Sequence, residues 1–210
     1  NFTAMKTFFS ILVILVFCYQ NVFSQAPGCP SVDVGPDTTI GCSTSSCVLL
    51  SADYFNVGQT TSYTATSTPY TPPYPFAGGT QLFIGIDDEW SNIINMPFNF
   101  CFFGNTYNQI VIGTNGVISF DVSLAGGYCN FGFSNTIPNT TGEPYRNSIN
   151  GAYHDIDPSI GGDINYAILD SYPCRTFVVN YNNVPHFLCN SITTTQQIVL
   201  YETTNVIEVY

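Results

Sequence analysis

Three aspartates close to one another in a glycine-containing segment are the residues best suited to chemistry. Asp155, Asp157 and Asp163 carry carboxylates, and calcium takes roughly six to eight oxygen ligands, so one loop could supply several of them. Gly161 and Gly162 would let the backbone fold Asp163 back toward the other two. The spacing is not that of an EF-hand, and aspartates commonly close a turn through their own backbone. The segment therefore predicts either a calcium site or a hydrogen-bonded turn.

A second acidic run, Asp87 to Glu89, leads into Trp90, the only tryptophan of the chain. Acidic groups beside an exposed indole could bind a cation or a sugar, with the ring stacked on the pyranose. A lone tryptophan in a β domain is usually buried. The run is therefore either a ligand site or, as we expect, a solvated turn beside a core tryptophan.

A catalytic constellation is not evident from the sequence. A glycosidase needs two carboxylates that face each other about 5–10 Å apart across a sugar, whereas the acidic pairs above stand two residues apart and would point the same way on a strand. The chain has two histidines, His154 and His186, and no Gly-x-Ser-x-Gly elbow. We predict that the protein is not an enzyme and has no cofactor other than a possible calcium ion.

A proline- and tyrosine-rich stretch, residues 69–79, interrupts the apolar patterning. Its four prolines remove backbone donors, so the stretch should be irregular or polyproline-like. Tyr70 and Tyr74 could stand exposed and contact a glycan or a protein, or they could pack across a sheet edge and protect it. Together with Trp90 they are the candidate ligand-contact aromatics.

The cysteines predict a disulfide framework in an oxidising compartment. Beyond residue 24 there are seven, an odd number: Cys29, Cys42, Cys47, Cys101, Cys129, Cys174 and Cys189. We expect the pairs Cys42–Cys47, Cys101–Cys129 and Cys174–Cys189, with Cys29 left for a partner further downstream. Spacing does not determine connectivity, so other pairings remain open.

The first 24 residues resemble an export signal. A lysine precedes the apolar run Phe8 to Phe17, and Val22 to Ser24 loosely fits the small-residue cleavage rule, so the mature chain would begin at Gln25. The run is too short for the roughly 20 residues that span a bilayer. We predict that residues 1–24, with residues 1–4 upstream of the signal, direct export through the inner membrane. The mature chain, with no membrane span, would be at the cell surface or extracellular.

The charge balance limits the partners. Fourteen acidic against three basic residues give a formal charge of -11, and only 8% of residues are charged. Too few cations remain for a nucleic-acid interface, and the charged fraction is far below the roughly 25% of soluble domains. The expected partners are surface glycans or other cell-surface proteins.

Short alternating runs rich in Val, Ile, Phe, Tyr and Thr recur between Gly, Asn, Pro and Ser, which is typical of an all-β protein. Asn115–Gly116 between two such runs predicts a two-residue hairpin turn. The alternation continues to Tyr210, so we expect one antiparallel, disulfide-bonded β-sandwich domain over residues 25–210 that is incomplete at its C-terminus and follows a signal-peptide helix. The expected strands include 81–87, 98–102, 110–112, 117–120, 164–168, 177–181, 197–201 and 206–210.

Several of these segments resemble a known family. Residues 96–121, 154–169, 174–187 and 194–210 are similar to nidogen-like (NIDO) extracellular β domains. With residues 29–55 and 70–76 added, the chain more closely resembles the N-terminal region of large secreted adhesin-like or gliding-motility-associated surface proteins of Bacteroidota. That resemblance implies export by the type IX secretion machinery through a C-terminal domain outside this sequence.

The resemblance implies a non-enzymatic extracellular module that mediates surface attachment or presentation. The alternatives are a carbohydrate-binding module of a secreted polysaccharide-degrading enzyme and, less favoured, a hydrolase in its own right. Attachment rests on family likeness, because no residue constellation in the chain encodes it.

Overall fold

Residues 29, 32–33, 49, 52–54, 60–132 and 146–210 are described by the structure, a computed structural model. The predicted signal segment, residues 1–24, and the expected Cys42–Cys47 pair lie outside these residues.

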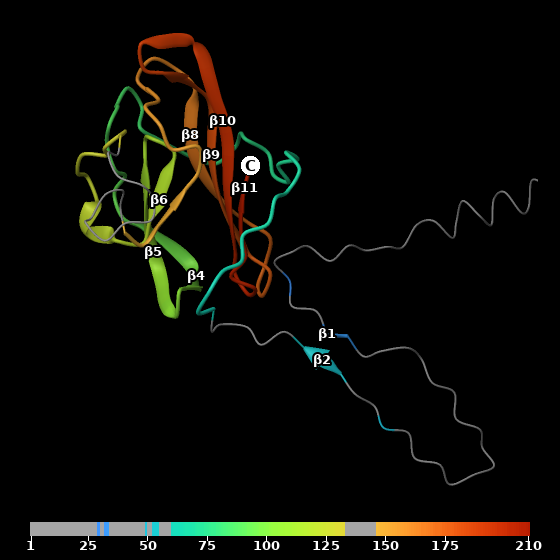
Figure 1. The fold of residues 1–210 in the computed structure, drawn as a ribbon. Coiled ribbons are helices and arrows are strands. Elements are labelled where there is room, and N and C mark those ends of the chain that lie inside the picture. Colours follow the sequence, from blue (N-terminus) through green and yellow to red (C-terminus); the bar gives the residue numbers. More distant parts are fainter. Residues whose placement is uncertain (1–28, 30–31, 34–48, 50–51, 55–59, 133–145) are drawn as a thin grey trace, which may run out of the picture.

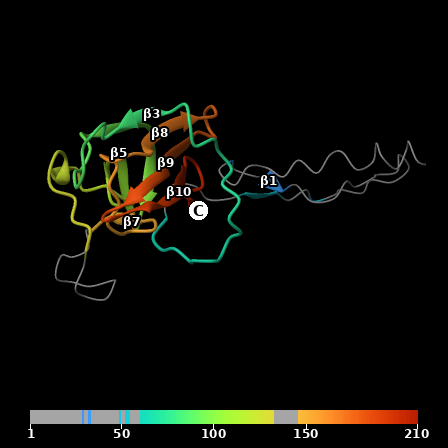
Figure 2. The same cartoon turned by 90° about the horizontal axis from the view of Figure 1, so that it is seen from above.

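Two antiparallel sheets pack face to face as a sandwich, as Figures 1 and 2 show. The four-stranded sheet has the order β4-β5-β6-β7, with β4 at Ile94–Phe102, β5 at Asn105–Gly113, β6 at Val117–Ser119 and β7 at Ser148–Asn150. The five-stranded sheet has the order β11-β10-β9-β8-β3, with β3 at Thr80–Leu82, β8 at Asp163–Leu169, β9 at Thr176–His186, β10 at Cys189–Tyr201 and β11 at Ile207–Val209. The predicted all-β sandwich is confirmed.

Outside the two sheets, β1 (Val32–Asp33) and β2 (Asp53–Tyr54) pair with each other. A single 3-10 turn, η1, covers Val122–Leu124, and the side chain of Asp121 caps it by accepting a hydrogen bond from the Ser123 N–H. No helix among the described residues is long and apolar enough to cross a membrane.

The core follows from the period of two in the strands. In β4, every second side chain from Ile94 to Phe100 turns inward, so Phe98, Phe100 and Phe102 form an inward phenylalanine face along the expected strand 98–102. Phe100 stacks on Phe120 with ring centroids 5.7 Å apart. These rings pack against apolar residues of the opposite sheet, among them Phe177, Val179, Ile198 and Leu200.

The five-stranded sheet is buried on both faces along part of β9, since every residue of that strand from Thr176 to Tyr181 is buried. On the outer face, Val178, Val199 and Tyr201 pack with Tyr74 from the proline-rich segment. This segment runs along the outside of the red strands in Figure 1. Tyr74 therefore covers a sheet face, and not the sheet edge that the sequence suggested.

A ladder of three buried amides, Asn165, Asn180 and Gln197, holds the proline-rich segment to the sheet. They lie side by side on β8, β9 and β10, and each is at most 1% exposed. Asn180 Nδ2 donates to Asn165 Oδ1 at 3.0 Å, and Gln197 Nε2 donates to Asn180 Oδ1 at 2.8 Å. Three of the four remaining N–H groups donate outward to backbone carbonyls of the segment, and the fourth, on Asn165, donates to the Asp163 carboxylate.

The carbonyls that receive these bonds belong to three consecutive residues. Gln197 donates to Tyr74 O at 3.0 Å, Asn180 to Pro75 O at 3.3 Å, and Asn165 to Phe76 O at 2.8 Å. Prolines in this segment lack the N–H groups that an added strand would need. The amide side chains of the sheet donate the hydrogen bonds that these carbonyls need, in place of the backbone N–H groups of a neighbouring strand. The segment is thereby bound to the sheet without becoming one of its strands.

Cys29 and Cys174 form a disulfide with Cα atoms 4.8 Å apart and a sequence separation of 145. Cys101, Cys129 and Cys189 are free. The expected pairs Cys101–Cys129 and Cys174–Cys189 are therefore wrong, as is a downstream partner for Cys29.

The expected pairs do not form because the fold holds these cysteines far apart. Cys174 precedes β9, whereas Cys189 begins β10 beside His186 at the other end of β9. A strand of this length separates its ends by roughly 35 Å. Cys101 and Cys129 are each buried in a different place, Cys101 on β4 against Thr60 O and Cys129 against Trp90.

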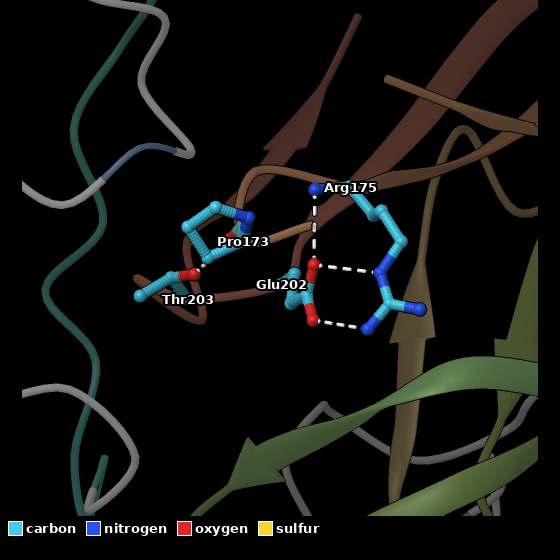
Figure 3. A network of polar contacts seen from close by, with 4 residues as sticks. All are labelled: Pro173, Arg175, Glu202 and Thr203. Carbon is cyan, nitrogen blue, oxygen red and sulfur yellow. Dashed lines mark hydrogen bonds and ion pairs between the residues drawn. The ribbon is translucent and has the colours of Figure 1, made fainter. Parts of the chain in front are cut away.

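Arg175 and Glu202 form an ion pair (Figure 3). Arg175 directly follows the disulfide-bonded Cys174, so the pair and the disulfide lie at the same end of the sheet. Glu202 accepts hydrogen bonds from Arg175 Nε at 2.8 Å and from the Arg175 backbone N–H at 3.0 Å, and it also contacts Nη2. Thr203 Oγ1 donates to the Pro173 carbonyl beside it. Hydrogen bonding from Arg175 lowers the pKa of Glu202, with the cation's charge adding to the effect.

We expect the Asn180→Leu substitution to lower the free energy of unfolding by about 2–4 kcal/mol, because it removes three hydrogen bonds and leaves their buried partners unsatisfied. Urea unfolding under non-reducing conditions measures the change. Asn108→Leu, at an exposed position of β5, is the matched control and should stay within about 0.5 kcal/mol. Equal effects of the two substitutions would contradict the ladder's importance.

The lowered pKa of Glu202 makes a prediction about acid stability. The pair stabilises the fold above the ordinary carboxyl pKa of 4.5, and the stabilisation is lost as pH falls through the lower folded value. Glu202→Gln should therefore lower the free energy of unfolding by about 1 kcal/mol at pH 7. At a pH below the folded pKa of Glu202, the substitution should change it by nearly nothing. Arg175→Lys, which keeps the charge but not the fork, should lose less. A Glu202→Gln deficit independent of pH would refute this account.

Candidate functional site

The turn between β5 and β6 organises the end of the sandwich away from the disulfide. Thr114, Asn115 and Gly116 connect Gly113 to Val117, and among these three only Gly116 has positive φ, +79°. The turn has three residues, so the predicted two-residue hairpin is wrong. A Cβ on Gly116 would lie 2.7 Å from the Ala152 carbonyl oxygen, and this close approach requires glycine.

Asn115 is a fully buried hub for three neighbouring segments. Its Nδ2 donates to Asp88 Oδ1 at 2.8 Å and to the Cys129 carbonyl at 2.9 Å, while its Oδ1 accepts from the Ile156 N–H at 3.1 Å. Sequence reasoning missed this role because Asn-Gly is first of all a turn pattern. The hub brings the two acidic segments of the sequence together at one end of the fold.

Four carboxylates are electrostatically coupled around this hub: Asp87, Asp88, Asp155 and Asp157. Burial raises the pKa of Asp87 to about 6, and the charges of the other three contribute further. Burial also raises the pKa of Asp155, with Asp88 and Asp157 adding to the effect. The sequence distances between these segments gave no indication that the two runs would meet.

The predicted calcium ligands do not converge on one point. Asp157 is buried and accepts hydrogen bonds from the Ser159 N–H at 2.9 Å and from the Ser159 hydroxyl at 2.5 Å, the turn that was the alternative to a metal site. Asp163 lies in β8 and accepts from the Asn165 amide. Within the part of the chain that is described, no three His, Cys, Asp or Glu side chains gather as a metal site. Calcium binding stays a prediction.

The candidate ligand-contact aromatics separate into three environments. Trp90 is 0% exposed and packs with Val111, Val117 and Cys129, so its assignment as a ligand contact is wrong and the core alternative is confirmed. Tyr74 is half-buried, with its hydroxyl 3.1 Å from Thr176 Oγ1. Tyr70 is 61% exposed and donates its hydroxyl hydrogen to the Thr195 carbonyl at 3.3 Å. Only Tyr70 of the three presents most of its ring to solvent.

The two histidines meet beside Thr194. The Nε2 atoms of His154 and His186 are 3.2 Å apart, and Thr194 Oγ1 lies 2.9 Å from each. Nδ1 of His154 is 2.7 Å from the Ala152 carbonyl oxygen. Burial lowers the pKa of His154, and the neighbouring His186 lowers it further. The sequence did not indicate that the two histidines would meet, since nothing local links residues 32 positions apart.

An apolar hairpin tip adjoins the histidines. We define it by Phe187, Leu188 and Ile192, all exposed, with Leu188 84% exposed. Phe187 and Leu188 form the turn between β9 and β10, and Leu188 has φ +57°. Backbone bonds fix the turn from below, from the Phe187 N–H to Asp155 O at 3.2 Å and from the Asp157 N–H to Pro185 O at 2.7 Å.

A sequence model of the NIDO-related family matches residues 61–210. The chain belongs to the NIDO-related family. The nidogen-like resemblance seen in the sequence is thereby confirmed, and the matched residues include both sheets of the sandwich. No match was found among curated proteins or among solved structures.

NIDO-related domains are a non-catalytic, extracellular type of module, and no enzyme family is indicated for this chain. The hydroxyl of Thr194, a buried residue, lies 2.9 Å from the Nε2 atoms of both imidazoles. Chemically, this end of the domain offers acceptor oxygens, two imidazoles and an exposed apolar tip.

Proposed function

We propose that this NIDO-related domain is a non-enzymatic attachment module of a secreted, cell-surface protein, and that the hairpin tip makes the contact. Export by residues 1–24, an adhesin or gliding-associated role and secretion through the type IX machinery belong to the same proposal, supported by sequence resemblance. The observation that carries it is the conformation and exposure of Leu188.

Leu188 is in an unfavourable position for folding. A residue with φ near +57° is normally glycine, asparagine or aspartate, because a branched side chain is strained there. Strain of this kind costs on the order of 1 kcal/mol or more. At 84% exposure, leucine gains almost no burial in return within the chain. Contact with an apolar surface outside the domain would supply that burial.

The tip is also prepared for contact. Phe187 and Leu188 form a turn closed by the paired residues His186 and Cys189, and the segment 155–157 braces that end of β9 through two backbone hydrogen bonds. An apolar anchor held in one conformation loses little entropy when it binds. Attachment through a rigid tip therefore needs only a complementary apolar pocket.

The surroundings of the tip define the partner. Asp155 and the neighbouring carboxylates make this end acidic, and the whole chain has a formal charge of -11. Anionic polymers would be repelled. The partner that fits is a protein on an adjacent surface with an apolar pocket and a neutral or basic rim.

The test is adhesion of cells that display the full-length protein, measured as the fraction of cells that remain attached under shear flow. We expect Leu188→Asn to reduce attachment at least about fivefold, because it removes the apolar anchor while asparagine tolerates the positive φ. Ile84→Asn, at a similarly exposed apolar site that is not part of the hairpin tip, should leave attachment unchanged.

Attachment by the Leu188→Asn cells at the wild-type level would refute the proposal. A glycan array run in parallel tests the carbohydrate-binding alternative. Binding to one polysaccharide that is lost with Tyr70→Ala and kept with Leu188→Asn would replace the attachment function with that of a carbohydrate-binding module.

A further inference from the structure

His154 and His186, which come from two different segments of the chain, form a second site beside the hairpin tip. His186 ends β9, and His154 precedes Ile156, which forms a β-bridge with His186. The two rings have centroids 4.5 Å apart and an interplanar angle of 55°. We propose that His154 and His186 bind one divalent transition-metal ion of the imidazole-preferring kind, such as Cu²⁺ or Zn²⁺.

The spacing of the nitrogens is that of two ligands on one ion. In a tetrahedral zinc site, nitrogens about 2.0–2.1 Å from the metal stand roughly 3.3 Å from each other. The two Nε2 atoms are 3.2 Å apart, and Thr194 Oγ1 lies 2.9 Å from both. The three atoms therefore form one small triangle that a single ion can cap.

The backbone fixes the chemical form of His154. A carbonyl oxygen accepts hydrogen bonds and cannot donate them, so the 2.7 Å contact with Ala152 O requires a hydrogen on Nδ1. In the neutral ring, Nε2 then carries the lone pair, and this atom is the one that faces His186. Metal-bound histidines are commonly oriented in this way by a carbonyl on the other ring nitrogen.

Access and charge also favour a cation. Both histidines are partly exposed, so an ion can reach the ring nitrogens from solvent, and the Asp155 carboxylate is electrostatically coupled to His154. Two imidazoles are fewer ligands than a closed structural zinc site has, so the Thr194 hydroxyl and water would complete the shell. Imidazole nitrogens select copper, zinc or nickel over calcium and magnesium.

The site can be read out without ambiguity because the chain has only these two histidines. Pulsed electron paramagnetic resonance on the full chain, made without a histidine tag and loaded with one equivalent of Cu²⁺, counts the coordinated imidazoles. The Cys189→Ser background removes the thiol that is exposed among the described residues and would compete for the metal. We expect two imidazoles on one copper, and a single imidazole after His186→Gln.

Zinc titration calorimetry in the same background gives a second readout. His154→Gln and His186→Gln should each weaken zinc binding at least about tenfold, whereas calcium should give no heat that depends on the histidines. Coordination of one imidazole or none in the protein with both histidines would overturn the proposal even if a variant failed to fold. Zinc affinity unchanged in both variants would also overturn it.

Discussion

Three amide side chains across the five-stranded sheet solve a problem that the proline-rich segment creates. Its carbonyl groups need donors, and its prolines prevent it from pairing as a strand. Asn165, Asn180 and Gln197 supply those donors from the sheet face, and each amide nitrogen uses both of its hydrogens. The segment is thereby fixed where it covers Val178, Val199 and Tyr201.

The two ends of this sandwich carry different features. β9 is buried on both sides over Thr176–Tyr181, so side chains pack against both faces of the sheet there. One end is closed by the Cys29–Cys174 disulfide and the Arg175–Glu202 pair. The other end carries the hairpin tip and the two histidines, on which the proposed attachment and the proposed metal binding depend.

The sequence predicted those parts of the structure that are determined by neighbouring residues along the chain. Alternating phenylalanines predicted the inward face of β4, and the proline-rich stretch predicted irregular backbone. What could not be predicted depends on which strand ends meet in space. Cys174 and Cys189 are close in sequence but lie at opposite ends of β9, whereas His154 and His186 are distant in sequence and meet through one β-bridge. Asn115 was visible only as a turn former, since burial decides its role as a hub.

The most direct test of the central claim is solvent exchange of side-chain amides followed by NMR. The Nδ2 and Nε2 hydrogens of Asn165, Asn180 and Gln197 are buried and bonded, so their signals should persist in D₂O long after those of exposed asparagines such as Asn108 have disappeared. Disappearance of the three signals as fast as that of Asn108 would show that the ladder opens freely, and the account of the covered sheet would then fail.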